Sequence, residues 1–321
     1  MPQPQTKMEQ IDPLSRDAIQ ALDDLAGLHP GFRPVHAKGI LLSGTFTPSA
    51  AVGTLTRAPH VDRPSISIAV RFSDFAGVPN VPDNDVENAG PRGVAIRFYL
   101  AEHAHTDIIA HSVDGFPTRT AEEFVEFLRA VHASGPGAQK PTPVESFLAS
   151  HPAALAFVQI PKPIPASFAK ESFFSVNALK FTNSQGVSKF GRYRIVPQDG
   201  NAYLDPSAAA KESPDFLFDE IKGRIANGTA TMRILVQVAS DGDVVDDATI
   251  HWPNERPLVE FGTIELNALV PDGDAAQRHI IFDPIPRVDG IEPSGDPLLD
   301  PRVSIYLASG RRRRAAGVAG E

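Results

Sequence analysis

A tyrosine near the end of the chain has the neighbour that would let it act as an anionic ligand. Tyr306 follows Arg302 by four residues, and residues four apart on a helix lie side by side. A guanidinium about 4 Å from the phenol oxygen is worth about 4 kcal/mol of attraction at an effective dielectric constant of ~20. Such a pair could supply a phenolate, a hard donor suited to ferric iron. The same spacing also fits a surface Arg–Tyr pair, and spacing alone leaves both interpretations open.

A histidine just before a strand pattern is the second candidate. His36 lies in the run RPVHAKG, three residues after Arg33. Imidazole changes its protonation close to neutral pH, which suits a general acid or base. A structural turn would explain the same spacing, so this segment alone does not decide. The ten histidines form no i, i+4 pair, and His103 and His105 are expected in a polar loop.

The composition of the chain excludes several other chemistries. The 321 residues include no cysteine and carry a formal net charge of −9, which excludes thiolate catalysis and Cys-ligated metals and disfavours nucleic acid as a partner. No G-x-S-x-G, H-E-x-x-H or Walker motif occurs. The N-terminus lacks the apolar region of a secretion signal, and no apolar run reaches the ~18 residues of a membrane span. We therefore expect a cytoplasmic protein with no membrane span.

The elements that must position these residues follow from hydrophobic periodicity. Alternating apolar residues between Pro- and Gly-rich turns predict antiparallel strands at 39–46, 65–73, 93–100, 175–183, 188–196, 229–239 and 262–270. Helical spacing of apolar residues predicts helices at 17–28, 120–132, 143–158 and 213–226. Residues 283–301, rich in Pro and Asp, are expected to be extended coil. This order predicts the α+β class, with an antiparallel β-barrel and inserted and flanking helices.

Several short motifs, in chain order across residues 31–306, resemble those of the haem catalases. They are FRPVHAKG at 32–39, RFS at 71–73, PRG with IRFY at 91–99, NALKFTN at 177–183, WP, PL and G between 252 and 262, FDP at 282–284, GIEPS at 290–294 and RVSIY at 302–306. Such an ordered set is far more specific than any single motif. The short N-terminal arm and the end soon after Tyr306 resemble the small catalase-related peroxidase branch, the minimal catalases. The resemblance implies a loose arm at 1–14 and a single catalase-like haem domain at 15–321.

The resemblance implies haem b, iron protoporphyrin IX, as the cofactor and a role for each matched residue. Tyr306 would be the axial iron ligand, ionised by Arg302 and stabilising an oxoferryl state. His36 would act as general base and then acid on the bound peroxide, with Ser73 orienting its ring. The remaining cofactor contacts would come from the propionate-binding residues Arg33, Arg71 and Arg313, from Val35 at the entrance, and from Phe116 and Phe124 against the ring.

Two positions depart from the catalase pattern. His111 falls where catalases have an asparagine beside the bound peroxide, and Gly90 replaces an acidic residue of the substrate channel. Asparagine donates to the peroxide, whereas neutral histidine donates or accepts. His111 is therefore a third catalytic candidate, and both changes favour peroxidase activity over efficient disproportionation of hydrogen peroxide.

These implications predict a haem peroxidase that reduces hydrogen peroxide or organic hydroperoxides with a small-molecule electron donor, with weak catalase activity alongside. A fatty-acid hydroperoxide isomerase is one alternative, although Val35, where such enzymes would have threonine, argues against it. A non-enzymatic haem-binding protein is the other, and it would not need an acid–base group such as His36. Because the N-terminal arm is short, the resemblance implies a homodimer rather than a tetramer.

Overall fold

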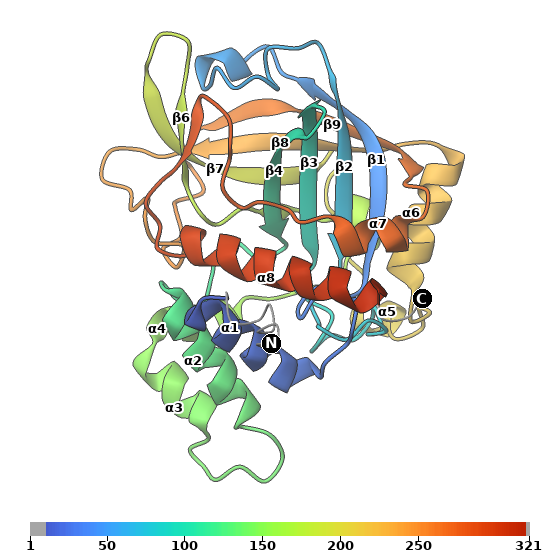
Figure 1. The fold of residues 1–321 in the computed structure, drawn as a ribbon, viewed down its shortest axis with the longest axis vertical. Helices are drawn as coiled ribbons and strands as arrows, with labels where there is room; N and C mark the ends of the chain where they lie inside the picture. The colour runs from blue at the N-terminus through green and yellow to red at the C-terminus, as the bar shows by residue number, and fades with distance from the viewer. Residues whose placement is uncertain (1–10, 319–321) are drawn as a thin grey trace, which may run out of the picture.

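An antiparallel β-barrel forms the centre of the computed structural model, which describes residues 11–318 (Figure 1). Its strands are β1 (Gly39–Pro48), β2 (Ile66–Ser73), β3 (Gly93–Ala101), β4 (Ala104–His111), β5 (Phe173–Phe174), β6 (Leu179–Thr182), β7 (Ser188–Pro197), β8 (Ala230–Val238), β9 (Leu258–Leu269) and β10 (Ile291–Pro293). Strand β7 pairs with both β5 and β8, which closes a ring that excludes only β6 and β10. The predicted α+β barrel is confirmed.

Apolar side chains fill the inside of the barrel. Because successive residues of a strand point to opposite faces, the buried Ile68, Val70 and Phe72 of β2 all point inward. Phe46 and Phe98 meet in this interior edge to face, with ring centroids 5.0 Å apart, a favourable arrangement for aromatic rings. The residues that alternate with these therefore point to the outer face, where polar chemistry is available.

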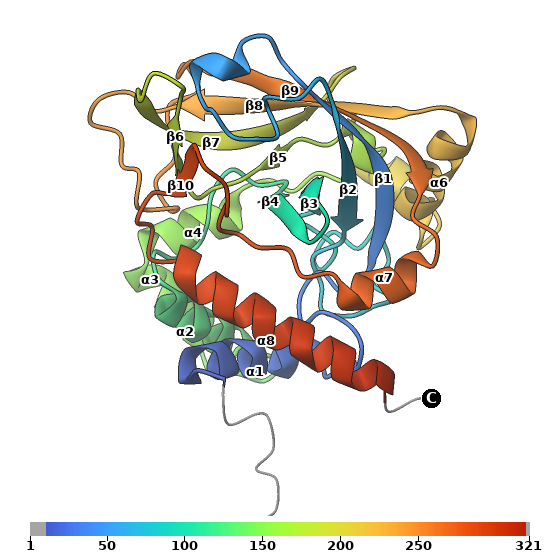
Figure 2. The same ribbon diagram turned by 45° about the horizontal axis from the view of Figure 1, so that its top comes forward.

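Three helices gather on one side of the barrel (Figure 2): α1 (Pro13–Ala26), α2 (Ala121–His132) and α8 (Leu299–Val318). Helix α1 packs against both others, and Arg312 of α8 donates to Asp23 of α1 at 2.9 Å. The remaining helices are α3 (Pro143–Ser150), α4 (Pro152–Gln159), α5 (Pro206–Ala209), α6 (Phe216–Asn227) and α7 (Gly273–His279), with 3-10 turns η2 (Val52–Thr54) and η3 (Phe168–Lys170). No helix in the described part of the chain has the length and apolar character of a membrane span.

The expected polar loop around His103 and His105 applies only to His103, because the two residues belong to the β3–β4 hairpin and His105 lies in its second strand. His103 lies in the turn with a φ of 60°, and His105 pairs with Tyr99 across the hairpin. The strand pattern of β4 is obscured by Asp107, which is charged but buried. Arg97 compensates this charge by donating to both carboxylate oxygens, at 2.7 and 2.9 Å.

The helix predicted at 143–158 is two helices, α3 and α4, that meet at a proline. Pro152 has no N–H to donate, and its ring disfavours a helical conformation in the residue before it. His151 accordingly has φ −126° and ψ 83°, which ends α3 before α4 begins.

Helix α1 begins inside the predicted arm at 1–14. Its first residue is Pro13, because the carboxylate of Asp12 caps the helix by accepting the N–H of Ser15 at 2.9 Å. Most of the predicted arm, residues 1–10, lies outside the described residues.

The predicted coil at 283–301 contains short regular pieces. Strand β10 lies within it and pairs with β6, and α8 begins at Leu299. Helix α7, which precedes it, was not predicted. Elements of three to seven residues are too short to establish a periodic pattern.

His60 lies inside the barrel among aromatic rings. It is 1% exposed, contacts Phe46, Phe98 and Phe261, and its Nδ1 has no hydrogen-bond partner within the described residues. Burial lowers the pKa of His60 to about 4, compared with ~6.5 in an unfolded chain. Between these values only the unfolded state binds the proton, so this residue makes the fold less stable as the pH falls from 6.5 to 4.

Replacing His60 by leucine should remove this acid sensitivity. As the pH falls below 6.5, the wild type should lose about 1.4 kcal/mol of unfolding free energy per pH unit relative to the variant. At pH 4 this relative loss should reach roughly 3 kcal/mol, compared with the difference between the two proteins at pH 7. Urea unfolding of both proteins at several pH values measures this difference. A difference that stays constant from pH 7 to 4 would contradict the assignment.

Candidate active site

Four neighbouring strands align one row of residues on the outer face of the barrel. Gly39 pairs with Ser73, Ser73 with Gly93, and Gly93 with His111. Directly opposed residues of antiparallel strands share a face, so Ser73 and His111 flank Gly93 on the outside. Two strand spacings, ~10 Å, separate their backbones. The glycine between them leaves a gap in which another side chain can lie.

His36 occupies this gap from the loop before β1. A Cβ on Gly93 would lie 2.7 Å from the Ser73 hydroxyl and 2.8 Å from the His36 ring, so a glycine is required there. His36 has a φ of 57°, a conformation uncommon outside glycine. Its main-chain N–H donates to the carbonyl of Phe75 at 2.6 Å, and the two rings meet edge to face. Phe75 therefore holds both the strained backbone and the ring of His36.

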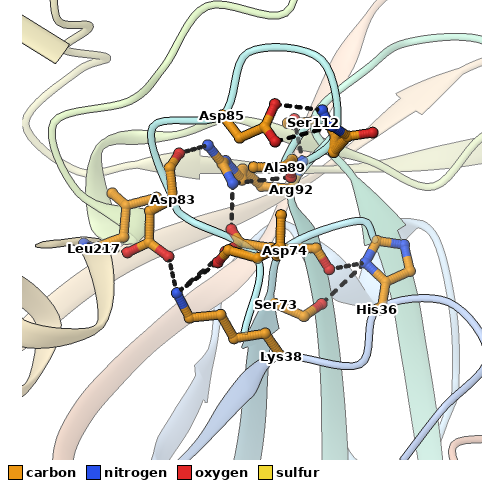
Figure 3. Close-up of polar contacts among 12 residues, drawn as sticks. His36, Lys38, Ser73, Asp74, Asp83, Asp85, Ala89, Arg92, Ser112 and Leu217 are labelled. Carbon is orange, nitrogen blue, oxygen red and sulfur yellow. Dashed lines mark hydrogen bonds and ion pairs between the residues drawn. The ribbon is translucent and has the colours of Figure 1, made fainter. Parts of the chain in front are cut away.

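The His36 ring has a defined tautomer. Its Nδ1 lies 2.9 Å from the carbonyl oxygen of Asp74 and 3.1 Å from Ser73 Oγ (Figure 3). A carbonyl only accepts hydrogen bonds, so Nδ1 carries the hydrogen and Nε2 has a free lone pair. Burial, followed by the charges of Arg71 and His111, lowers the pKa of His36 to about 3. The ring is thus neutral at neutral pH and presents an unprotonated Nε2, as a general base requires.

His111 has the opposite tautomer. The main-chain N–H of Val113 donates to its Nδ1 at 3.3 Å, so in the neutral ring the hydrogen is on Nε2. Burial, with a smaller effect of Arg302, lowers the pKa of His111 to about 4. His111 also lies close enough to His36 to lower the pKa of that residue. Together the two rings offer one acceptor and one donor to a small ligand.

The three predicted propionate-binding arginines come together. Arg33 and Arg313 both donate to the carbonyl of Ile280, at 3.2 and 2.9 Å, and Arg71 donates to the side chain of Gln277 at 2.7 Å. None of the ion pairs within residues 11–318 includes any of the three. Burial, followed by the charges of its neighbours, lowers the pKa of Arg71 to about 9 and that of Arg313 to about 10. Such a cluster favours an anion with several oxygen atoms.

Tyr306 and Arg302 lie one turn apart on α8. Arg302 Nη2 donates to the phenol oxygen at 3.1 Å, and its Nη1 donates to the amide oxygen of Asn177. Asn177 in turn donates to Asp296 at 2.8 Å, and both of these residues are buried. These hydrogen bonds fix the guanidinium beside the phenol oxygen.

Apolar side chains connect the two ends of the site. Val35, Phe124 and Ile305 pack against one cluster formed by α1 and α2, which brings the neighbours of His36 and Tyr306 to the same space. The rings of Phe116 and Phe124 lie 5.2 Å apart, tilted by 37°. All the predicted site residues are therefore grouped between the outer face of the barrel and the helices.

Some residues of the site have no role in the sequence-based prediction. Gly93 and Asn177 occur in the quoted motifs, and a glycine within a strand is a signal of close approach. Gln277 and Asp296 have no local signal, because their contacts with Arg71 and Asn177 span 206 and 119 residues of sequence.

The site fits the haem that the sequence predicts. Haem is a flat, largely apolar group with two carboxylates, so it requires apolar walls, cations at one end and an axial donor. The arginine cluster supplies the cations, and the buried Nε of Arg313 has no partner among the described residues. Val35, Phe116 and Phe124 supply apolar surface. Tyr306, next to a fixed guanidinium, supplies an oxygen donor suited to ferric iron.

Replacing Arg33 by methionine should affect haem binding and apoprotein stability in different directions. Burial, followed by Arg71 and Arg313, lowers the pKa of Arg33 well below its usual range, so removing its charge should leave the Tm of the apoprotein unchanged or higher. Loss of one charged hydrogen bond should weaken haem binding about 10- to 100-fold. Haem titration and thermal melting measure the two effects. Arg314→Met, at an exposed position of α8, the helix that carries Arg313, is the control, and a destabilised Arg33→Met protein with normal haem affinity would contradict the assignment.

Comparisons with known proteins show similarity in both sequence and fold. The family model described as catalase matches residues 30–319. The catalase-related peroxidase of Mycolicibacterium paratuberculosis is 33% identical over 299 residues, which are 92% of this chain and 93% of the relative. That of Synechococcus elongatus is 31% identical, covering 92% of this chain and 87% of the relative. A fungal catalase structure superposes with a TM-score of 0.78 at 23% identity, over 92% of this chain and 62% of the catalase.

Proposed function

Because this chain belongs to the catalase family, we propose that it is a haem-dependent peroxidase that reduces hydroperoxides with electrons from a small external donor. The observation that carries the proposal is the pair of half-buried, neutral imidazoles with complementary tautomers, His36 and His111. Relatives that match this chain over most of their own length are named catalase-related peroxidases, which supports peroxidase activity rather than disproportionation.

The residues present fit haem in three respects. Tyr306 would bind the iron, Arg302 would hold its oxygen in place through a hydrogen bond, and Arg33, Arg71 and Arg313 would bind the propionates. Haem, when bound, would supply the redox chemistry of iron, which provides the two electrons that reduce the peroxide and regains them from the external donor. The protein's own residues then determine how protons move and how the peroxide is oriented.

His36 moves the proton in this scheme. The free lone pair of Nε2 accepts the proton of the incoming hydroperoxide, and the ring becomes positively charged. When the O–O bond breaks, the same nitrogen returns the proton to the leaving oxygen, which departs as water or an alcohol. The low pKa of His36, about 3, makes the charged ring short-lived and the return of the proton favourable.

His111 orients the peroxide in this scheme. Its Nε2–H donates a hydrogen bond, whereas the unprotonated Nε2 of His36 accepts one. A hydroperoxide has one O–H donor and further acceptor lone pairs, so it satisfies both rings at once. An imidazole in place of an amide also removes one of the two donor hydrogens available at that position, which accounts for our preference for peroxidase over catalase chemistry.

The direct test is a comparison of two peroxides in the haem-loaded protein. Hydrogen peroxide and an organic hydroperoxide are each supplied with and without a reducing dye, while dye oxidation and oxygen release are recorded. We expect dye oxidation with both peroxides and little oxygen release. Vigorous oxygen release without dye oxidation would reverse the proposal in favour of catalase activity.

Two further outcomes distinguish the alternative functions. Rapid conversion of a lipid hydroperoxide without any donor would indicate an isomerase. A haem-loaded protein that reacts with neither peroxide would indicate haem binding alone. We favour the peroxidase because the strained and fully bonded position of His36 serves acid–base chemistry and is not needed for haem storage.

A further inference from the structure

Behind His36 lies a cluster of buried charged side chains that the proposed chemistry does not use. It consists of Lys38, Asp74, Asp83 and Arg92 (Figure 3). Asp74, Asp83 and Arg92 are at most 3% exposed. The Lys38 ammonium contacts Asp83 and lies 4.0 Å from Asp74, and Arg92 contacts the other oxygen of Asp74. We call these four residues the charge cluster.

The charge cluster connects His36 to distant parts of the fold. Asp83 accepts the main-chain N–H of Leu217 in α6 at 2.8 Å, and Lys38 contacts Asp215 at 2.7 Å. Asp215 is largely exposed, and with Lys38 it lines a pocket of about 400 Å³. The cluster therefore extends from the interior to a solvent-accessible pocket.

Stability alone is a poor explanation for this cluster. Removing four charges from water is costly even when they are paired, and apolar replacements are often as stable. One oxygen of Asp74, Oδ2, has no hydrogen-bond partner within residues 11–318. Burial raises the pKa of Asp74 to about 8, while Arg92 opposes the increase and Asp83 adds to it. Such unfavourable groups are typical of functional sites.

The same residues hold the two backbone segments that fix the His36 ring. The carbonyl of Asp74 accepts the His36 Nδ1–H at 2.9 Å, and its N–H donates to the carbonyl of Lys38 at 3.2 Å. Ala37, between His36 and Lys38, donates to the carbonyl of Ala76 at 3.0 Å. The side-chain contacts of Lys38 and Asp74 therefore hold two backbone segments in place: the one that carries His36 and the one whose carbonyl accepts the His36 Nδ1–H.

We propose that Asp74 is a positioning residue for the proposed peroxidase chemistry: its carboxylate, anchored by Arg92, Lys38 and Asp83, keeps its carbonyl oxygen on His36 Nδ1 and so keeps Nε2 unprotonated and correctly oriented. The inference rests on the proposed function for its catalytic consequence only. The orientation and tautomer of His36 can be measured without haem.

Asp74→Asn tests the proposal, because it keeps the side-chain size and removes the charge. In the apoprotein with ¹⁵N-labelled histidine, His36 should change from a single Nδ1–H tautomer to a mixture. In the haem-loaded protein the second-order rate constant for hydrogen peroxide should fall about 10- to 100-fold, the usual cost of losing an outer partner of a site. Both measurements are made at pH 9, because burial raises the pKa of Asp74 to about 8 and the carboxylate is ionised above that pH. The wild-type rate constant should rise through an inflection near pH 8 as Asp74 ionises, and the variant should lack this inflection.

Asp243→Asn is the matched control. Asp243 pairs with both ends of the Arg256 guanidinium, at 2.7 and 2.8 Å, in the loop before β9. Breaking this pair should leave the His36 tautomer and the peroxide rate constant unchanged. If Asp74→Asn alone does not fold, the double variant Lys38→Met/Asp74→Asn removes one charge of each sign, keeps the cluster neutral and is expected to give the same two changes.

A single His36 tautomer and a rate constant within twofold of wild type in the Asp74 variant would overturn the proposal. That result differs from a failure of the proposed function, in which the wild-type holoprotein itself does not react with peroxide. In that case the apoprotein spectrum still decides whether Asp74 positions His36.

Discussion

Tyr306→Phe is expected to lose at least about 100-fold in haem affinity, beyond what loss of an outer partner of a metal site usually costs. The substitution removes one oxygen atom and retains the aromatic ring. In the structure that oxygen contacts Arg302, which Asn177 and Asp296 hold in place. Without the phenol oxygen, the chain would offer the iron no oxygen donor at this position, and the Arg302 guanidinium would lose its hydrogen-bond partner there. Haem titration of the apoprotein followed by its visible spectrum measures the effect.

Tyr99→Phe provides the control for this experiment. Tyr99 lies in β3 and is 45% exposed, so its substitution should change neither haem affinity nor spectrum. Circular dichroism of the Tyr306→Phe apoprotein should match the wild type, because within residues 11–318 the phenol oxygen makes a single hydrogen bond, to Arg302. A Tyr306→Phe protein that binds haem normally and with an unchanged spectrum would refute the assignment of Tyr306 as the iron ligand.

His36→Ala is expected to slow the reaction with hydrogen peroxide by about 10²- to 10⁴-fold, the range for loss of a general acid–base group. The reason is the free Nε2 of His36, which no other described residue replaces in position: His111 carries its hydrogen on Nε2 and is a donor. Stopped-flow measurement of the haem-loaded variant under excess peroxide gives the rate constant. Haem affinity should remain within a few-fold of wild type, because Tyr306 and the arginine cluster are unchanged.

His132→Ala is the matched control, since His132 is an exposed residue of α2. Its rate constant should equal that of the wild type. Equal turnover of His36→Ala and wild-type protein would show that His36 is not the acid–base group and would favour the non-enzymatic alternative.

Local patterns in the sequence determined much of this protein. The alternation in β2 separates Ile68, Val70 and Phe72 inside the barrel from Arg71 and Ser73 outside it, and this requires only the two-residue period of a strand. The Arg302–Tyr306 contact is equally local, because four residues make one helical turn. The ordered motifs indicated the catalase family, and the comparisons confirm this membership.

Local patterns failed where a buried charge or a proline overrode them. Strand β4 was missed because Asp107 is buried. Two partners make that burial acceptable: Arg97, ten residues away on the neighbouring strand, and the main-chain N–H of Asp283, 176 residues away. The helix at 143–158 was predicted as one element although Pro152 divides it. In both cases one residue determined the secondary structure of a segment whose other residues gave a different pattern.

Only the tertiary structure decided the chemical state of the site. The tautomer of His36 depends on the carbonyl of Asp74, which is 38 residues away, and that of His111 on the N–H of Val113. Arg33 and Arg313 meet at the carbonyl of Ile280, which is 247 residues from the first and 33 from the second. Periodicity indicates which face a side chain occupies, whereas strand register and loop paths decide which donor or acceptor it meets. A histidine therefore becomes a base or a donor only when the chain has folded.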